Sequence, residues 1–401
     1  MRNIRTAFLV LVLCNLTSGA TAQVLPSEPI IIGDGRAVIG GDVAASIAPI
    51  DTGYFNFSDY DHTTLREIRL GLTASVRATD HIAILGELRS ENFERVTPFA
   101  LYARIHPWRE RRLDVQIGRI PPTFGAFTRN AYGHDNPLIG YPLAYQYLTS
   151  VRPDSAPANV DELLRMRGRG WRSSFGIGNR TPDRGLPLVT AFSWDTGIQV
   201  TTGWRAVDVT AAVTNGSASN PRVRDDNDGK QFATRVKVIP ATGLVIGTSF
   251  ARGQYANRQL IDAEPGTADR FVQHAYGIDL EYSRNHWIGR ADAVLSQWDV
   301  PAVASPLLDV PLRALALRVE GRYTIFPGAY AAARAEHLAF NHVRGTSRVD
   351  EWEAPVSRLE VGGGYYLQRN VVARVSVQMN WRDGGRVRRL ALPAAQLLFW
   401  F

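Results

Sequence analysis

The chain has 401 residues, with 45 Lys and Arg against 38 Asp and Glu for a formal net charge of +7, and its only cysteine is Cys14. A single cysteine excludes a disulfide framework and a metal site built from several thiolates. The basic charge does not indicate a nucleic-acid-binding protein, because the arginines are spread along the chain and do not gather into one stripe.

Residues 1–22 have the pattern of a cleaved secretory signal. Two arginines precede the apolar run from Ala7 to Cys14, and Ala20-Thr21-Ala22 forms a small-x-small cleavage site. The apolar run is far shorter than the ~20 residues that a spanning helix needs. The bulky Leu13 argues against a lipid-attachment site at Cys14. We therefore expect a mature chain of residues 23–401 without cysteine.

The mature chain is predicted to be all-β, an antiparallel transmembrane β-barrel. No later stretch approaches 18 consecutive apolar residues, and no linker divides the chain. Alternation with period two dominates instead, since the residues from Ile68 to Arg77 alternate between apolar side chains and polar or small ones. Similar stretches begin at Val272, Leu315 and Val371. Such strands are long for a soluble sheet but suit tilted membrane strands of ~9 to 11 residues. We expect about 16 strands, or 18 if Gly170–Trp194 adds a pair.

The connections between these strands alternate between tight and long, which is typical of outer-membrane barrels with short periplasmic turns and long outer loops. The tight connections are Pro240 to Gly243, Arg284 to His286, Phe326 to Gly328 and Gln368 to Asn370. The long connections are Gly216 to Gly229, Arg252 to Arg270, Pro301 to Pro311 and Asn341 to Ala354.

The chain ends in "LPAAQLLFWF", and residues 386–401 are predicted to form the closing strand, with Leu397, Phe399 and Phe401 facing lipid. This ending resembles the assembly signal of Gram-negative outer-membrane barrels. The resemblance implies recognition by the barrel-assembly machinery and a place in the outer membrane, in contact with membrane lipids and lipopolysaccharide.

A second motif, "LDVQIGRIPPTFGAF" from Leu113 to Phe127, resembles the phosphate-selective porin family, in which a Gly followed by a basic residue runs into a Pro-Phe-Gly turn. Here Gly118-Arg119 and Pro122-Thr123-Phe124-Gly125 correspond in part. Thr123 is inserted, and no lysine cluster is present, because Lys230 and Lys237 are the only lysines. The resemblance implies a channel of 16 strands that forms a trimer.

The longest irregular stretch, Ile120 to Arg169, exceeds the ~12 to 15 residues of an ordinary structureless loop. It is rich in aromatic residues and proline, and "NVDELLRMR" predicts a short helix capped by Asn159. We expect residues 120–169 to fold inward as a constriction loop. Packing over the outer mouth or against a neighbouring subunit is the alternative.

Arginines are expected to line the lumen, where guanidinium groups would favour small anionic solutes. Alternation turns nine of them inward, namely Arg69, Arg77, Arg89, Arg290, Arg318, Arg322, Arg358, Arg374 and Arg382. The constriction loop adds Arg129, Arg152, Arg165, Arg167 and Arg169. Inward carboxylates such as Glu320 and Glu360 offset this charge, so solvated ladders of arginine and carboxylate are the competing interpretation.

No spacing of histidine, serine or carboxylates indicates an enzyme, a metal site or a cofactor. His134-Asp135 could be part of a catalytic triad, but such pairs are mostly structural. The sequence therefore predicts a porin for passive diffusion of small hydrophilic solutes, with anion preference and a possible homotrimeric assembly. The alternatives are an exporter of an acidic polysaccharide and a structural or adhesive barrel with a blocked pore.

Overall fold

The computed structural model describes residues 26, 28–57, 63–108, 112–126, 133–190, 192–225, 229–264 and 270–401. The predicted signal peptide, residues 1–22, and Arg129 of the predicted constriction loop lie outside these residues. Among the described helices, none is long and apolar enough to cross a membrane.

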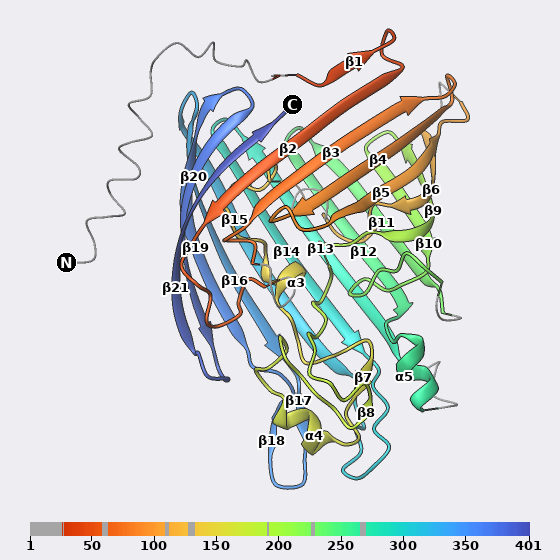
Figure 1. Cartoon of the computed structure of the whole chain (residues 1–401), viewed down its shortest axis with the longest axis vertical. Helices are drawn as coiled ribbons and strands as arrows, with labels where there is room; N and C mark the ends of the chain where they lie inside the picture. Colours follow the sequence, from red (N-terminus) through yellow and green to blue (C-terminus); the bar gives the residue numbers. More distant parts are fainter. Residues whose placement is uncertain are drawn as a thin grey trace, which may run out of the picture.

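Sixteen strands of the described chain form one closed antiparallel barrel (Figure 1). Each strand pairs with its neighbours in chain order, and β21 pairs with β2 to close the ring. The first eight are β2 (Ala37–Ile47), β3 (Ile68–Arg77), β4 (Ile82–Glu91), β5 (Val96–Ile105), β6 (Leu113–Ile120), β9 (Asp195–Trp204), β10 (Val207–Thr214) and β11 (Gln231–Ala241). The other eight are β12 (Leu244–Gln254), β13 (Val272–Arg284), β14 (Trp287–Trp298), β15 (Leu312–Phe326), β16 (Ala329–Phe340), β19 (Val356–Gln368), β20 (Val371–Arg382) and β21 (Arg389–Trp400).

The first and last strands of the barrel meet at β2, where one edge of β2 pairs with two different segments. Its last six residues pair with β21, and β1 (Ile30–Ile32) pairs with its first three. Phe401 extends the β21 ladder, because its N–H donates to the Gly41 carbonyl at 2.9 Å and its carbonyl accepts from the Gly41 N–H at 3.0 Å. The C-terminal residue therefore completes the closing ladder.

The strands alternate between an apolar outer face and a polar inner face, as predicted. In β15 the outward Leu315, Leu317 and Val319 are exposed, whereas the intervening Arg318 and Glu320 are buried inside the barrel. A closed sheet forces this split, because successive side chains point to opposite faces.

Short and long connections segregate to opposite ends of the barrel, which confirms the predicted alternation. The short-turn end carries residues 78–81, 106–112, 205–206, 242–243, 285–286, 327–328 and 369–370 together with the C-terminus. The long-loop end carries 48–67, 92–95, 121–194, 215–230, 255–271, 299–311, 341–355 and 383–388. The exceptions in length are residues 92–95 and 383–388, which are short for the long-loop end, and residues 106–112, which are long for the short-turn end. Asn285, at φ +53°, adopts the left-handed conformation that two-residue hairpin turns favour.

The connection between β6 and β9, residues 121–194, is here called the lumen loop. Among its described parts, α3 (Leu143–Gln146) lies inside the barrel, whereas β7 (Ser155–Ala156), α4 (Val160–Arg165) and β8 (Ile177–Gly178) lie at the long-loop end (Figure 1). The Asn159 side chain caps α4 by accepting from the Glu162 N–H at 2.9 Å, as predicted. Elsewhere at the long-loop end lie α5 (Arg258–Ala263) and the hairpin of β17 (His342–Arg344) and β18 (Val349–Glu351).

Gly170–Trp194 adds no strands to the wall, so the barrel has 16 strands and not 18, and the lumen loop extends 25 residues beyond the predicted Arg169 end. This stretch pairs within the loop, since β8 pairs with β7 and Ser173 forms a bridge with Asp183. It lacks the alternation that would give it one face for lipid and one for water, which explains why it does not join the wall.

Candidate pore and its lining

The lumen loop leaves β6 at two prolines and crosses the barrel. Pro121 and Pro122 have no N–H for a ladder, so pairing with β9 ends at Ile120. Phe124 then packs against Gly277 of β13, where an added Cβ would come within 2.9 Å of the Phe124 ring. Gly277 therefore makes room for Phe124 at the far wall.

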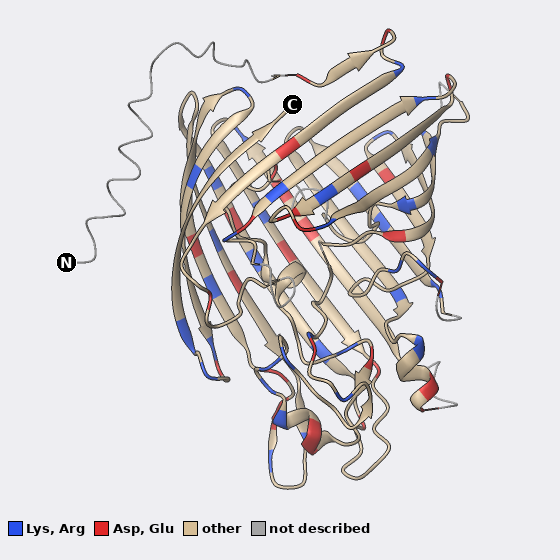
Figure 2. Ribbon diagram, viewed as in Figure 1, with Lys and Arg blue, Asp and Glu red and all other residues tan. Residues whose placement is uncertain are grey.

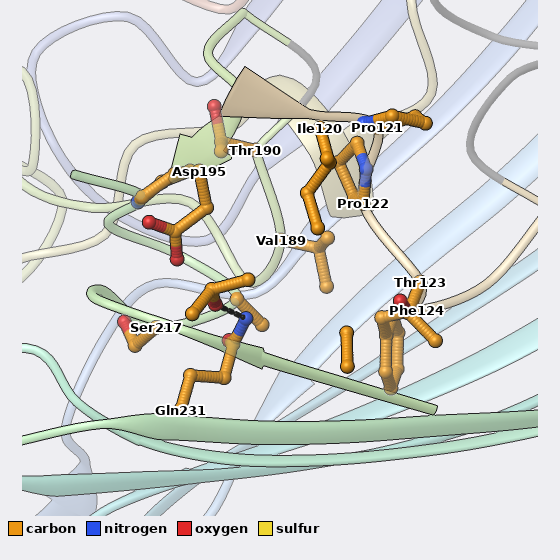
Figure 3. Close-up of a pocket in the computed structure, with 14 residues that line it drawn as sticks. Ile120, Pro121, Pro122, Thr123, Phe124, Val189, Thr190, Asp195, Ser217 and Gln231 are labelled. Atoms are coloured by element: carbon orange, nitrogen blue, oxygen red, sulfur yellow. Dashed lines mark hydrogen bonds between the residues drawn. The ribbon is translucent and has the colours of Figure 1, made fainter. Parts of the chain in front are cut away.

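The base of the loop is also tied by polar contacts. The Thr123 hydroxyl lies 2.7 Å from Gln199 Oε1, and the Gly125 N–H donates to Ser249 Oγ at 3.0 Å. Figure 3 shows residues from the two ends of the loop, Ile120–Phe124 at one end and Val189, Thr190 and Asp195 at the other, around one small pocket. Because both ends are held at the wall, the loop cannot swing out without breaking these contacts.

The middle of the loop is bound to the opposite wall, formed by β16 and β19. The N–H groups of Gly140 and Leu143, just before α3 and at its start, donate to Glu360 Oε1 at 3.0 Å and Glu336 Oε1 at 2.7 Å. The loop's carbonyls accept from arginines, with Arg334 donating to Gly140 at 2.6 Å and Arg358 to Tyr141 at 3.0 Å.

Arg334 is the centre of this wall and is fully buried. Its guanidinium lies 2.6 Å from Glu360 and 3.3 Å from both Glu320 and Glu336. Register places it directly opposite Glu320 on β15 and Glu360 on β19. Buried charges are tolerated only when they are paired and hydrogen-bonded, which this lattice provides. The sequence analysis did not identify Arg334. Its alternation predicts that Arg334, Glu320 and Glu360 all point inward on three neighbouring strands, and this pattern could have indicated the ionic cluster.

The nine arginines predicted to line the pore point inward or lie at strand ends, but their surroundings differ. Arg69, Arg318, Arg358, Arg374 and Arg382 are each at most 6% exposed. Two of them donate to Tyr141, Arg69 to its hydroxyl and Arg358 to its carbonyl. Arg374 donates to the Gly133 carbonyl, and Arg382 donates to the Gly53 carbonyl. Arg318 pairs with Asp292. These five side chains are covered by loops or neighbouring side chains.

The other four predicted arginines are either more exposed to solvent or form ion pairs and ring contacts. Arg290 pairs with Glu281 at 2.7 Å and Glu320 at 3.0 Å, and Arg322 stacks over the Tyr330 ring at 4.3 Å. Arg77 is exposed at the end of β3. Arg89 pairs with Glu87 and stacks over the Phe99 ring at 3.3 Å.

The described arginines predicted in the constriction loop do not converge on the barrel axis. Arg152 is buried within the loop, with two bonds to Asp154 at 2.9 and 2.8 Å and others to the carbonyls of Ser173 and Thr181. Arg165, Arg167 and Arg169 lie at the long-loop end.

An open vestibule of about 990 Å³ remains between the lumen loop and the wall of β4, β5 and β6. The loop supplies Tyr145, Gln146 and Leu186 to its lining. Its described lining carries equal numbers of opposite charges, namely Arg89, Arg95, Arg119 and Arg184 against Glu91, Glu94, Asp154 and Asp183. Figure 2 shows the same mixture of blue and red along the barrel strands.

Arg119, in the motif that resembles phosphate-selective porins, has no carboxylate within 4 Å among the described residues. It donates to the carbonyls of Trp194, at 3.2 Å, and Pro98, and to Ser193 Oγ at 3.2 Å. Its charge on the vestibule wall is therefore not neutralised by an ion pair, unlike that of Arg334.

His134 and Asp135 lie 3.6 Å apart, and the His134 ring lies 5.8 Å from that of Trp400. Both side chains are partly exposed, so the geometry is that of a packed surface pair.

Comparisons with known proteins agree on the fold. No protein-family profile and no curated protein sequence matches the chain. Among solved structures, OmpF of Salmonella typhi in complex with daunomycin is 9% identical, with a TM-score of 0.58 over 93% of this chain and 100% of that one. OmpT of Vibrio cholerae is 9% identical, with a TM-score of 0.56 and the same coverage of both chains.

An anion-selective porin from Comamonas acidovorans is 8% identical, with a TM-score of 0.54 over 91% of this chain and 99% of that one. At these identities the likeness concerns the fold alone. The closed antiparallel ring, the segregated connections and the inward loop are common to one architecture, and the chain therefore has the 16-strand barrel fold of the outer-membrane porins.

Proposed function

We propose that this protein is an outer-membrane porin through which small hydrophilic solutes diffuse passively. The observation that carries the proposal is the vestibule of about 990 Å³ beside an inward loop that is bonded to both walls. A fixed loop that narrows a closed barrel beside an open vestibule suits size-limited diffusion. The likeness to solved porins supports the same function.

The proposal places the short-turn end in the periplasm and the long-loop end outside the cell, after cleavage of residues 1–22. The aromatic C-terminus at the short-turn end supports this orientation, as does the resemblance of Leu397, Phe399 and Phe401 to the barrel-assembly signal. The barrel-assembly machinery, membrane lipids and lipopolysaccharide are the expected partners. A homotrimer is part of the proposal, supported by a trimeric solved structure of similar fold.

Anion preference is the finer part of the proposal. Most charges on the inner wall are paired, as in Arg235 with Asp279 at 2.6 Å and Arg290 with Glu281 at 2.7 Å. Several described arginines of the wall, Arg119, Arg322 and Arg374 among them, form no ion pair with a described carboxylate within 4 Å. Guanidinium groups without an ion-pair partner would favour anions over cations along the path of diffusion.

Planar-bilayer recordings of the refolded mature chain, with reversal potentials under a KCl gradient, test this function. We expect an open channel whose reversal potential indicates chloride preference, and Arg119→Ala should reduce that preference. Heat-modifiable migration on a gel shows that each variant is folded. A folded protein that does not conduct would overturn the porin proposal, and a conducting channel without chloride preference would overturn the selectivity alone.

A second function, a structural barrel with a blocked pore, is favoured by the depth to which the lumen loop is buried. Tyr145, Leu163 and Leu188 of the loop are each about 1% exposed or less. The same recordings separate the two, because a blocked barrel would fold and insert without conducting.

A further inference from the structure

A second large cavity opens at the long-loop end, on the β20–β21 side of the barrel. It has a volume of about 810 Å³ and lies away from the residues that line the vestibule. Eight of its 16 described lining residues are arginines, and none is acidic. We call it the arginine pocket. The vestibule, in contrast, is lined by equal numbers of arginines and carboxylates.

Two sequence segments of similar composition build the arginine pocket. "RMRGRGWR", residues 165–172, comes from the lumen loop, and "RDGGRVR", residues 382–388, joins β20 to β21. Arg348, between β17 and β18, completes the set of arginines. Sequence analysis had singled out only the first of these segments, because nothing in the sequence shows that the second lies beside it.

Glycines bring the two segments together. Gly168 has φ +75°, and an added Cβ there would come within 2.8 Å of the Gly385 nitrogen. Gly385 itself has φ +70°. Only a residue without a side chain permits this approach in the left-handed conformation. The contact places the arginines of both segments around one cavity.

Two of the eight arginines hold the framework. Arg167 donates to Glu351 Oε2 at 3.0 Å and to the Asp383 carbonyl at 2.6 Å. Arg382 is 5% exposed and donates to the carbonyls of Gly53, Gly384 and Val387 at 3.1 to 3.2 Å. No described carboxylate lies within 4 Å of Arg382, so this buried guanidinium adds positive potential to the cavity without an ion-pair partner.

Five further arginines of the pocket are exposed and lack an ion pair with any described carboxylate: Arg165, Arg169, Arg172, Arg386 and Arg388. Like charges gathered around one concave surface repel one another, and a low-dielectric wall strengthens the field in the cavity. A bound polyanion would relieve this repulsion. Guanidinium groups are also the side chains best suited to bidentate contact with carboxylate and phosphate.

The pocket also has an aromatic wall. Tyr54, from the connection between β2 and β3, stacks on Trp171 with ring centroids 3.9 Å apart and an angle of 2° between the planes. Both residues line the cavity and are partly exposed. A stacked aromatic pair is a flat, rigid surface on which a sugar ring can lie. Arginines for the charged groups and an aromatic surface for the ring are complementary features.

We propose that the arginine pocket binds an acidic sugar that carries two or more carboxylate or phosphate groups. The proposal rests on the proposed function only in that the long-loop end faces outward, where such sugars occur as free solutes or within lipopolysaccharide. The pocket would capture the ligand at the mouth of the barrel, apart from the path of diffusion.

The test is equilibrium binding to the purified full barrel in detergent, by isothermal titration calorimetry at low and moderate salt. The probes are tri-galacturonate, the phosphorylated core oligosaccharide released from lipopolysaccharide, and neutral maltotriose. We expect at least one acidic probe to bind at least tenfold more tightly than maltotriose, and higher salt to weaken its binding.

Arg169→Ala/Arg386→Ala removes one exposed arginine from each segment and should weaken acidic-probe binding at least tenfold. Arg258→Ala/Arg270→Ala removes the same charge from another exposed connection at the same end and should leave binding unchanged. Trp171→Ala should weaken binding while the salt dependence persists. Binding by the core oligosaccharide alone would identify lipopolysaccharide as the source of the ligand, and binding by tri-galacturonate would identify a free acidic sugar.

Equal affinity for maltotriose, or equal loss in both double variants, would overturn the proposal, as would the absence of binding by both acidic probes. Because binding is measured without conduction, its outcome is independent of the porin proposal. A barrel that binds acidic sugars but does not conduct would support the pocket proposal and overturn the porin proposal. A conducting barrel that binds no acidic sugar would support the porin proposal and overturn the pocket proposal.

Discussion

Two walls of the same barrel carry inward arginines and use them differently. On the wall of β15, β16, β19 and β20, Arg334 and Arg358 are buried beneath the lumen loop and bonded to its carbonyls. On the wall of β4, β5 and β6, the inward Arg89 borders an open vestibule, and Arg119, which pairs in register with the outward Leu101, reaches the rim of the same vestibule. The strands have the same alternation and the same residue type. An inward arginine therefore becomes an anchor or a pore-lining group according to where the loop lies.

The largest expected effect comes from breaking the anchored wall at Arg334. Arg334→Ala would leave Glu320, Glu336 and Glu360 buried beside one another without their shared cation. Removing one partner of a buried ionic network typically costs about 3 to 5 kcal/mol. Urea unfolding of the refolded barrel in vesicles, followed by tryptophan fluorescence, measures the loss.

Arg290→Ala is the matched comparison for Arg334→Ala. Arg290 also contacts two glutamates, but its side chain is 18% exposed and water can replace it in part. We expect a loss well below that of Arg334→Ala. Equal losses in the two variants would show that partial exposure to water does not lower the cost of removing an arginine from this network.

The next effect concerns the position of the loop itself. Phe124→Ala removes the ring that packs against Gly277 and should loosen the start of the lumen loop. Single-channel recordings should show larger or noisier conductance. Phe326→Ala changes the same residue type on the outer face, where the ring is 54% exposed, and should conduct like the wild type. Unchanged conductance in a folded Phe124→Ala barrel would show that this contact does not position the constriction.

A smaller effect is expected on ion selectivity, where the two walls should differ clearly. Arg119→Ala should reduce the chloride-to-potassium permeability ratio severalfold, because a unit charge ~4 Å away in water contributes about 1 kcal/mol. Arg358→Met should leave the ratio unchanged, since its guanidinium is covered by the loop and bonded to Asn380, Tyr141 and Phe55. Reversal potentials measure both variants. A shift in Arg358→Met alone would reverse the assignment of the two walls.

The smallest expected effect is on pH dependence at the long-loop end. Burial raises the pKa of Glu353, which accepts from the Ser150 hydroxyl and the N–H groups of Gly168 and Ala354. A carboxyl whose pKa is raised by folding favours the folded state at low pH and loses that contribution as pH rises through the folded pKa.

The stability of the wild type relative to Glu353→Gln should therefore fall as pH rises from 4 to 8. Urea unfolding across this range measures the difference. A difference that does not change with pH would show that folding does not raise the pKa of Glu353.

The strands were predictable because a barrel wall imposes one physical rule on every residue. In β15 each outward side chain has apolar surroundings and each inward side chain faces a polar interior. Apolar and polar residues therefore alternate along the sequence of the strand. The turn chemistry at Asn285 and the cap at Asn159 are equally local. These features needed no knowledge of distant contacts.

The inward fold of the loop was predicted from the sequence, but its contacts with the wall were not, because they join segments far apart in the chain. Whether Arg358 faces water or the carbonyl of Tyr141, 217 residues away, is decided by the path of the lumen loop. Likewise, Gly170–Trp194 could be assigned to the loop and not to the wall only once its pairing within the loop was known. The arginine pocket is lined by two segments that are about 200 residues apart in the chain. The sequence of either segment alone indicates only a solvated basic stretch.

The most direct test of the central claim, that solutes pass on the β4–β6 side of the lumen loop, is accessibility of single cysteines to a charged thiol reagent during conduction. The mature chain has no cysteine if cleavage follows residue 22, so each engineered thiol is unique. Thr97→Cys lies on the exposed lining of the vestibule, and Gln378→Cys lies on the anchored wall, where the side chain is fully buried. We predict that the reagent reduces current rapidly through Thr97→Cys and leaves Gln378→Cys unchanged. Block at Gln378→Cys with no effect at Thr97→Cys would place the path on the opposite wall and contradict the account.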